Sequence, residues 1–400
     1  MIKLFFTGFF REIKMLWHDK RMLLMFLVAP VALSIVVCGA FSNQIVNNIP
    51  LAAVDENSSQ KTRELIEAFD ESDRFNVPYV VTNQEEAFRL MESGEVFGVI
   101  IIPTDYTRSL QLGQQAEVLI GVNSANVIIG NSAVVSVMQV VKTISSQIAV
   151  KSFVAGGNSI VEGTAKVMPI STVLRPWFNP QFSYLTYLGL GLTGLIFHQL
   201  FIMTVATAFA EEKKEGILSG KMTGKESAIH FINKYIFYGV TGYGNILFTY
   251  YEIIKIFDFP MRGSREDLAI LCGYFILCLL GLGALLGTLC KNTIHAIQWL
   301  MALTYPFFIL SGFSWPHSEM PIAWVKAAQF LPSTHFLSPV RDIVLMGVGF
   351  ETKTIAHSRE MLLYLAIGIF LLSMVTFIVQ VCLAKRRQQP KRAKKEVVQA

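Results

Sequence analysis

The chain has 400 residues, of which 52% are hydrophobic and 16% are charged, and its formal net charge is +5. Soluble globular proteins carry about 25% charged residues, so this composition argues against a soluble domain and for long uncharged stretches. The basic residues gather at the ends of the apolar stretches, which speaks against a nucleic-acid partner. The five cysteines lie in or beside those stretches, and no spacing of Cys and His predicts a metal site.

The first 21 residues alternate between apolar and basic faces at helical spacing. This pattern predicts a cytoplasmic amphipathic helix that lies in the membrane interface. An extension of the next apolar segment is the alternative interpretation. The predicted apolar face consists of Ile2, Phe5, Phe6, Phe9, Ile13, Leu16 and Trp17.

Residues 22–42 are predicted to form the first transmembrane helix, because a span needs about 20 mostly apolar residues. The small residues Cys38 and Ala40 allow a cleavable signal peptide as the alternative. However, the basic flank is long, and the apolar run exceeds the roughly 7–15 residues of a signal core. A membrane anchor is therefore the favoured interpretation.

Residues 43–183 are predicted to form a small extracytoplasmic α/β domain, because short apolar runs alternate there with helical patterns. A long helix is expected over 127–153, with an interruption near Gly130, before residues 158–183 return to the membrane. The predicted strands are 51–54, 77–81, 97–102 and 116–122, and the shorter helices are 59–69 and 83–91.

Asp55 and Glu56 are the candidate acid pair of this domain, at the end of its first strand. Turns that end strands favour such residues for structural reasons, and no His of the domain accompanies them. We therefore predict no catalytic set in this domain.

Residues 184–384 are predicted to form a five-helix transmembrane region, so that the chain is a polytopic α-helical membrane protein with six transmembrane helices. Basic residues precede the first span, follow the second and fill the tail 385–400, which places both termini in the cytoplasm. The five spans are expected at 184–210, 231–257, 268–289, 294–313 and 361–384.

Polar residues inside predicted spans are candidates for function. His198 and Gln199 lie deep in the second span, where they either line a transport path or form a hydrogen bond between helices. Glu252 and Lys255 lie three residues apart in the third span and are expected to pair with each other.

The cytoplasmic loop 211–230 begins with a dense acidic cluster that contains Glu211, Glu212 and Glu215, followed by Gly216. Such a cluster is either a solvated helix end or a docking surface. The Gly- and Lys-rich stretch that follows does not form a phosphate-binding loop, because each of its glycine pairs is one residue too close. We predict no nucleotide site and no cofactor in this chain.

Residues 314–358 are predicted to form an outer re-entrant or interfacial segment. Pro316 and Pro321 interrupt helical structure, and Trp315 and Trp324 are typical of a membrane boundary.

The chain resembles the ATP-binding-cassette type-2 exporter permeases of bacteria, in the branch with a long outer domain. The resemblance covers nearly the whole chain, including Asn179-Pro180, the acidic segment 211–216 and the turn 259–264. Its most specific part is the outer motif, which contains Ser311, Gly312, Phe313, Pro316, Met320, Pro321, Pro332, His335, Arg341 and Gly347. Ile217 replaces the usual Thr, and residues 218–228 depart from the usual apolar pattern.

The resemblance implies a permease of the bacterial cytoplasmic (inner) membrane that exports a drug, a lipid or a lipid-linked molecule. It implies a separate ATPase subunit that binds ATP and Mg and docks on the acidic segment, and a second permease copy or a paralogous permease. Membrane lipid and a periplasmic adaptor are further expected partners. The alternatives are a mechanotransmitter that acts on periplasmic partners and a membrane receptor or enzyme with the same fold.

Overall fold

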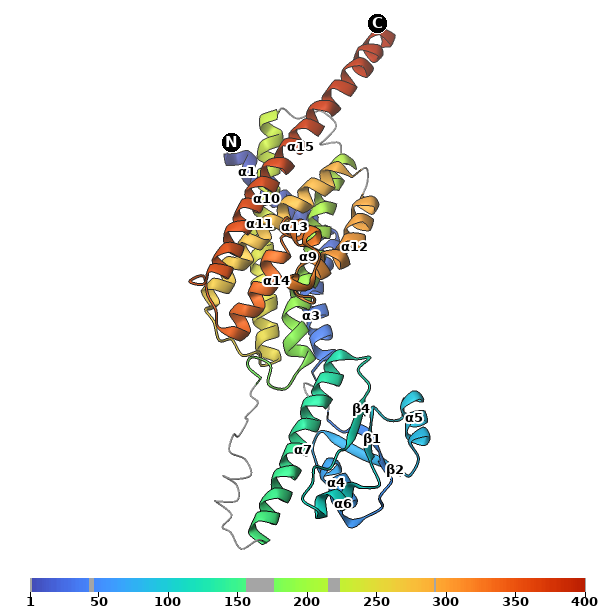
Figure 1. The fold of residues 1–400 in the computed structure, drawn as a ribbon. Coiled ribbons are helices and arrows are strands. Elements are labelled where there is room, and N and C mark those ends of the chain that lie inside the picture. Colours follow the sequence, from blue (N-terminus) through green and yellow to red (C-terminus); the bar gives the residue numbers. More distant parts are fainter. Residues whose placement is uncertain (1, 43–46, 156–175, 215–223, 291–292, 400) are drawn as a thin grey trace. The chain divides into compact units, whose positions relative to one another are not determined.

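The computed structural model describes residues 2–42, 47–155, 176–214, 224–290 and 293–399. The chain divides into two compact units (Figure 1). The helical unit comprises Met1–Ser42 and Leu185–Ala400, and the α/β unit comprises Asn43–Tyr184.

The helical unit contains long helices connected by short turns and by one segment of short helices. Its core is built from Phe, Leu, Ile and small residues contributed by helices that are distant in the sequence. In chain order, its elements are α1 (Ile2–His18), α2 (Lys20–Leu23), the π-helix η1 (Leu24–Val28), α3 (Ala29–Ala40), α9 (Tyr184–Lys214), α10 (Gly224–Ile256), α11 (Arg265–Leu289), α12 (Thr293–Leu310), the 3₁₀-helix η3 (His317–Glu319), α13 (Ile322–Ala328), α14 (Thr334–Arg341), the π-helix η4 (Asp342–Met346) and α15 (Lys353–Gln399).

Within the described residues, five helical segments are long and apolar enough to cross a membrane. Four of them coincide with the first, second, fourth and sixth predicted spans, and the fifth, Ile129–Lys151, lies in the α/β unit instead. They are Lys20–Ala40, Ile129–Lys151, Tyr184–Glu211, Arg265–Leu289 and Lys353–Leu383. The chain is thus a largely helical membrane protein with several apolar helices, and its number of spans stays a prediction.

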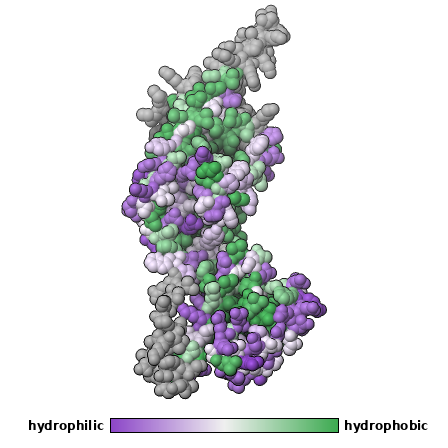
Figure 2. Space-filling view, in the orientation of Figure 1, coloured by the Kyte–Doolittle hydropathy of each residue, from purple (hydrophilic) through white to green (hydrophobic). Residues whose placement is uncertain are grey.

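The third and fifth predicted spans are helices that are not among these five candidates, one because of its polarity and the other because of its length. The third corresponds to α10, which has 33 residues but is too polar to be among the five candidates. The fifth corresponds to α12, whose apolar part Ile297–Leu310 is shorter than a standard span. Tyr, Asn and Thr side chains lower the hydropathy of α10, although its surface still carries exposed Val240 and Phe248. Figure 2 shows hydrophobic side chains beside polar ones on the surface of the helical unit.

Two glycines of α11 let this helix approach α9 closely. A Cβ atom at Gly283 would lie 2.7 Å from Cβ of Val205, and one at Gly287 would collide with the carbonyl oxygen of Ala206. Small residues four apart are the usual means by which membrane helices pack backbone against backbone. The pair Gly283 and Gly287 therefore sets the spacing between α9 and α11.

We expect Gly287→Ala to destabilise the helical unit by about 1–3 kcal/mol, because the added methyl group overpacks the contact with α9. Gly368→Ala on α15 is the matched control, since nothing lies within 4 Å of a Cβ atom there. The control should be neutral or slightly stabilising, because Ala favours helix more than Gly does. Thermal unfolding in detergent measures both variants. Equal melting temperatures for the two would contradict this account of the contact.

The α/β unit is built on a four-stranded sheet with the order β2-β1-β3-β4. β1 pairs in parallel with β2 and β3, whereas β3 and β4 are antiparallel. The four strands expected from the sequence are present, and the last is shorter than expected. The elements are β1 (Ile49–Asp55), α4 (Gln60–Asp70), β2 (Phe75–Val81), α5 (Gln84–Glu92), β3 (Gly98–Ile102), α6 (Tyr106–Gln111), β4 (Leu119–Val122) and α7 (Val127–Ala155).

Two details of this unit differ from what the sequence predicted, and a third decides between two interpretations of Asp55. The short helix α6 was not predicted. The expected interruption near Gly130 is wrong, because α7 is continuous from Val127, and Gly130 instead lets the helix approach Ser124. Asp55 ends its strand structurally: its carboxylate accepts hydrogen bonds from two backbone N–H groups of the following turn and from the hydroxyl of Thr62.

Candidate functional site

The outer motif begins where α12 ends, in a tight turn that its own residues stabilise. The Ser311 hydroxyl donates to the carbonyl of Phe308 at 2.6 Å and accepts from the N–H of Phe313. Gly312 has a φ of +80°, and a side chain there would collide with the ring of His317. The turn therefore requires Gly at this position.

Phe313 joins this turn to α9 and to α14. Its buried ring stacks against Tyr187 of α9, with centroids 6.4 Å apart, and the Arg341 guanidinium lies 5.1 Å from the same ring. Arg341 also faces Asp342, with 3.6 Å between Nε and Oδ1. Contacts of this kind hold the outer motif against the second predicted span.

A polar hollow of the helical unit lies beside this turn. A cavity of about 460 Å³ is lined by residues of η3, α14, η4 and α15, which come together from separate parts of the outer segment. Three histidines share it: His317, His335 and His357. His317 and His335 each donate an Nε2–H to a backbone carbonyl, of Leu310 and Gln329 respectively, both at 2.9 Å.

Burial shapes the chemistry of this polar cavity. It lowers the pKa of His335, and the neighbouring His357 and His317 lower it further, against the opposing effect of the hydrogen bond to Gln329. Burial raises the pKa of Asp342, whereas Arg341 opposes that rise. The buried Thr334 hydroxyl also lines the cavity and has no hydrogen-bond partner in the described part of the chain. The cavity thus holds imidazole, hydroxyl and carboxyl groups together with the ammonium of Lys353, which are groups that polar ligands use.

The remaining residues of the outer motif have structural positions around these turns. Met320 and Pro321 line an apolar hollow of about 440 Å³ together with Trp315 and Trp324. Pro316 precedes η3, and the N–H of His335 donates to the Pro332 carbonyl. Gly347 ends η4 with a φ of +75°.

The two polar residues of the second predicted span have different surroundings. Gln199 accepts a hydrogen bond from Thr304 of α12 and so joins α9 to α12. His198 is buried, its ring stacks on Phe275 of α11, and its Nδ1 has no hydrogen-bond partner among the described residues. Within those residues no ion pair joins Glu252 to Lys255, whose ammonium lies over the Tyr251 ring at 5.5 Å, so the predicted pair is wrong.

The acidic segment is described in part. Glu211 is half-buried in the last turn and a half of α9, Glu212 lies in the same helix, and Glu215 and Gly216 fall outside the described residues. The predicted loop 211–230 is partly helical, because α9 continues through Lys214 and α10 already begins at Gly224. Glu211 is therefore attached to a rigid helix and not to a free loop.

A buried ion pair lies next to this segment, and the sequence did not indicate it. Lys234 of α10 is 3.0 Å from Glu12 of α1, and their side chains are 0% and 1% exposed. The same ammonium donates to the Ala208 carbonyl of α9 at 3.1 Å. One cation thus joins α1, α9 and α10 one helical turn before Glu211.

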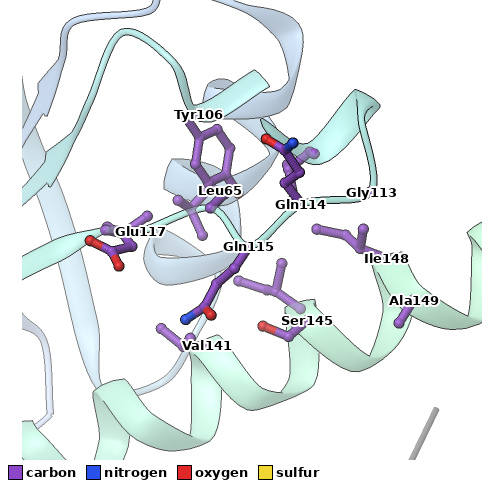
Figure 3. Close-up of a pocket in the computed structure, with 14 residues that line it drawn as sticks. Leu65, Tyr106, Gly113, Gln114, Gln115, Glu117, Val141, Ser145, Ile148 and Ala149 are labelled. Carbon is purple, nitrogen blue, oxygen red and sulfur yellow. The ribbon is translucent and has the colours of Figure 1, made fainter. Parts of the chain in front are cut away.

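The α/β unit contains a larger hollow of about 940 Å³ between α4, α6 and α7. Figure 3 shows Tyr106 and Leu65 on one side and Val141, Ser145 and Ile148 of α7 on the other. Gln114 and Gln115 contribute amide groups, so the hollow combines apolar walls with hydrogen-bonding groups. Among the described residues, no cluster of His, Cys, Asp and Glu could hold a metal ion.

Comparisons with known proteins cover most of the chain. A family model described as "ABC-2 family transporter protein" matches residues 20–383. The chain is 21% identical over 335 residues to the probable multidrug ABC transporter permease YbhR of Escherichia coli K12, covering 81% of this chain and 85% of that protein. It is 24% identical over 284 residues to the probable multidrug permease YbhS of the same organism, covering 66% and 68%. It is 21% identical over 350 residues to the inner membrane transport permease YhhJ, covering 85% and 88%.

Proposed function

Because the chain belongs to the ABC-2 family of transporter proteins, we propose that it is the permease subunit of an exporter that moves a hydrophobic or amphipathic molecule outward. The general role of an ABC transporter permease follows from the family and from the relatives. The match to residues 20–383 carries the proposal, since it includes all the long apolar helices of the helical unit.

The proposed topology has six spans, with both termini in the cytoplasm of a bacterial cell and the α/β unit outside. The basic residues around the first, second and last spans support this orientation. Two of the six would be α10, which is long enough at 33 residues, and α12. A helix rises about 1.5 Å per residue, so the hydrocarbon layer of about 30 Å is crossed by about 20 residues.

The energy for transport would come from a separate subunit. ABC transporter permeases work with an ATPase partner, and we assign its docking to Glu211, Glu212 and Glu215. The attachment of Glu211 to the rigid end of α9 supports this role, because a movement of the docked subunit would be transmitted to the whole helix. A second permease copy or a paralogous permease completes the proposed complex, and a periplasmic adaptor is a further candidate partner.

Two observations support the proposed class of substrate. YbhR and YbhS are named as multidrug permeases. The hollow at Met320 and Pro321 has apolar and aromatic walls, with Trp315 and Trp324 among them. Such walls suit a hydrophobic or amphipathic molecule more than a strongly polar one.

The proposal is tested by reconstituting the purified chain in liposomes with an ATP-binding-cassette ATPase that co-purifies with it. We expect ATP-dependent movement of an amphipathic dye across the membrane, and no ATP hydrolysis by the chain without its ATPase partner. The same complex with a catalytically inactive ATPase is the control. Stimulated ATPase activity without any movement of dye would contradict transport and support a mechanotransmitter.

A further inference from the structure

A cavity of about 460 Å³ opens between α10 and α11, close to the turn that connects them. One wall is apolar and is formed by Leu247 and Ile254 of α10 and Leu268 of α11. The other contributors include Tyr251, Lys255 and Arg265. The cavity therefore combines an apolar wall with a polar rim.

The rim of this cavity is cationic. Lys255 and Arg265 line it, and none of its lining residues is acidic. Both side chains are exposed, and neither is among the ion pairs of the described residues. The Lys255 ammonium lies 5.5 Å from the centroid of the Tyr251 ring, and both residues line the cavity. Two cations without carboxylate partners favour an anionic ligand, and the fork of Arg suits a phosphate group.

The surroundings indicate from which medium the ligand comes. Near the cavity, the surface of α10 and α11 carries exposed large hydrophobic side chains, among them Phe248, Ile256 and Ile270. Exposed side chains of this size on membrane-spanning helices suit contact with acyl chains. In the proposed topology this turn connects two spans, so the mouth of the cavity would open to lipid at the level where headgroups begin.

We propose that this cavity binds an anionic phospholipid, whose phosphate lies between Lys255 and Arg265 and whose acyl chain follows Leu247, Ile254 and Leu268. Basic pockets between membrane helices bind acidic headgroups through the same chemistry. The site is separate from the outer motif and from the acidic segment, so it does not depend on the direction of transport.

The test is a lipid titration of the delipidated full-length chain in neutral detergent, read by native mass spectrometry. Phosphatidylglycerol should bind more tightly than phosphatidylcholine. Lys255→Gln with Arg265→Gln should weaken phosphatidylglycerol binding by about tenfold or more, because each cation near an acidic headgroup contributes measurably. The matched control is Lys326→Gln, which removes another exposed lysine of the helical unit and should change nothing.

A second variant keeps the charges and fills the apolar wall: Ile254→Trp should also weaken phosphatidylglycerol binding. Inorganic phosphate alone should not displace the lipid, because it lacks the acyl chain. Equal binding of the two lipids to the wild type, or undiminished binding to the double variant, would overturn the proposal. So would unchanged binding to Ile254→Trp or full displacement by phosphate, since either would mean a site for a free anion.

Discussion

Lys234→Met is expected to destabilise the helical unit by about 3–5 kcal/mol, because it leaves the Glu12 carboxylate buried without its cation. The two side chains are almost fully buried and lie 3.0 Å apart. Glu12 has few alternatives: the Tyr238 hydroxyl is 3.5 Å from Oε2, and Oε1 has no partner among the described residues. The variant also frees the Ala208 carbonyl, so α1, α9 and α10 all lose a contact.

Thermal unfolding of the purified chain in detergent measures this effect, and the melting temperature should fall by roughly 10 °C. Lys61→Met is the matched control, since Lys61 pairs with Glu64 at 2.8 Å but both side chains are about half exposed, at 48% and 45%. Exposed pairs contribute about 0–1 kcal/mol, so this control should hardly change.

A second variant separates the buried charge from the lost packing. Glu12→Leu combined with Lys234→Met removes both charges, and buried ion pairs replaced by apolar groups are often neutral in stability. The double variant should therefore be more stable than Lys234→Met alone. A double variant that is as unstable as the single one would show that packing, and not the buried charge, determines the effect.

Glu211→Ala with Glu215→Ala is expected to abolish recruitment of the ATPase while the chain still inserts and folds. Truncating contacts at a charged interface costs about 2–5 kcal/mol of binding free energy. If the acidic segment were only a solvated helix end, the same substitutions would change the folding stability by about a few tenths of a kcal/mol. Glu211 lies on the rigid end of α9, so its loss should not unfold that helix. The measurements are co-purification of the ATPase and the coupled transport rate.

The matched control is Glu85→Ala with Glu86→Ala, which removes two exposed carboxylates from the first turn of α5. This control should recruit the ATPase normally. Wild-type assembly and wild-type export by the Glu211 and Glu215 variant would instead show that the acidic segment is a solvated helix end.

Local patterns predicted much of the fold, because they act over a few residues. The helices expected at 59–69 and 83–91 are present as α4 and α5, and the structure shows that Ser59 and Asn83 cap them. Four of the six predicted spans coincide with long apolar helices, because an apolar run of that length can be recognised directly in the sequence. The third and fifth predicted spans do not coincide with such helices, because α10 is too polar and the apolar part of α12 is too short.

The candidate site was predictable only in part, because some of its residues are contiguous in the sequence and others are distant. The outer motif is contiguous in the sequence, so its prolines, glycines and tryptophans could be recognised there. The polar cavity was not recognisable, because His317, His335 and His357 come from three different elements. Glu12 and Lys234 are 222 residues apart in the sequence, so no local spacing indicated their pairing. The pairing of Lys255 with Glu252, which spacing suggested, does not form among the described residues.

By itself, the sequence determined that this is a helical membrane protein with a mixed α/β insertion, because hydropathy and the spacing of apolar residues depend on residues near each other in the chain. The tertiary structure alone decided which charges are buried and which are free. Lys234 became a buried link between three helices, whereas Lys255 and Arg265 remained at the rim of an apolar cavity. A charge is desolvated or exposed by helices that pack from distant parts of the chain, and no local pattern records that packing.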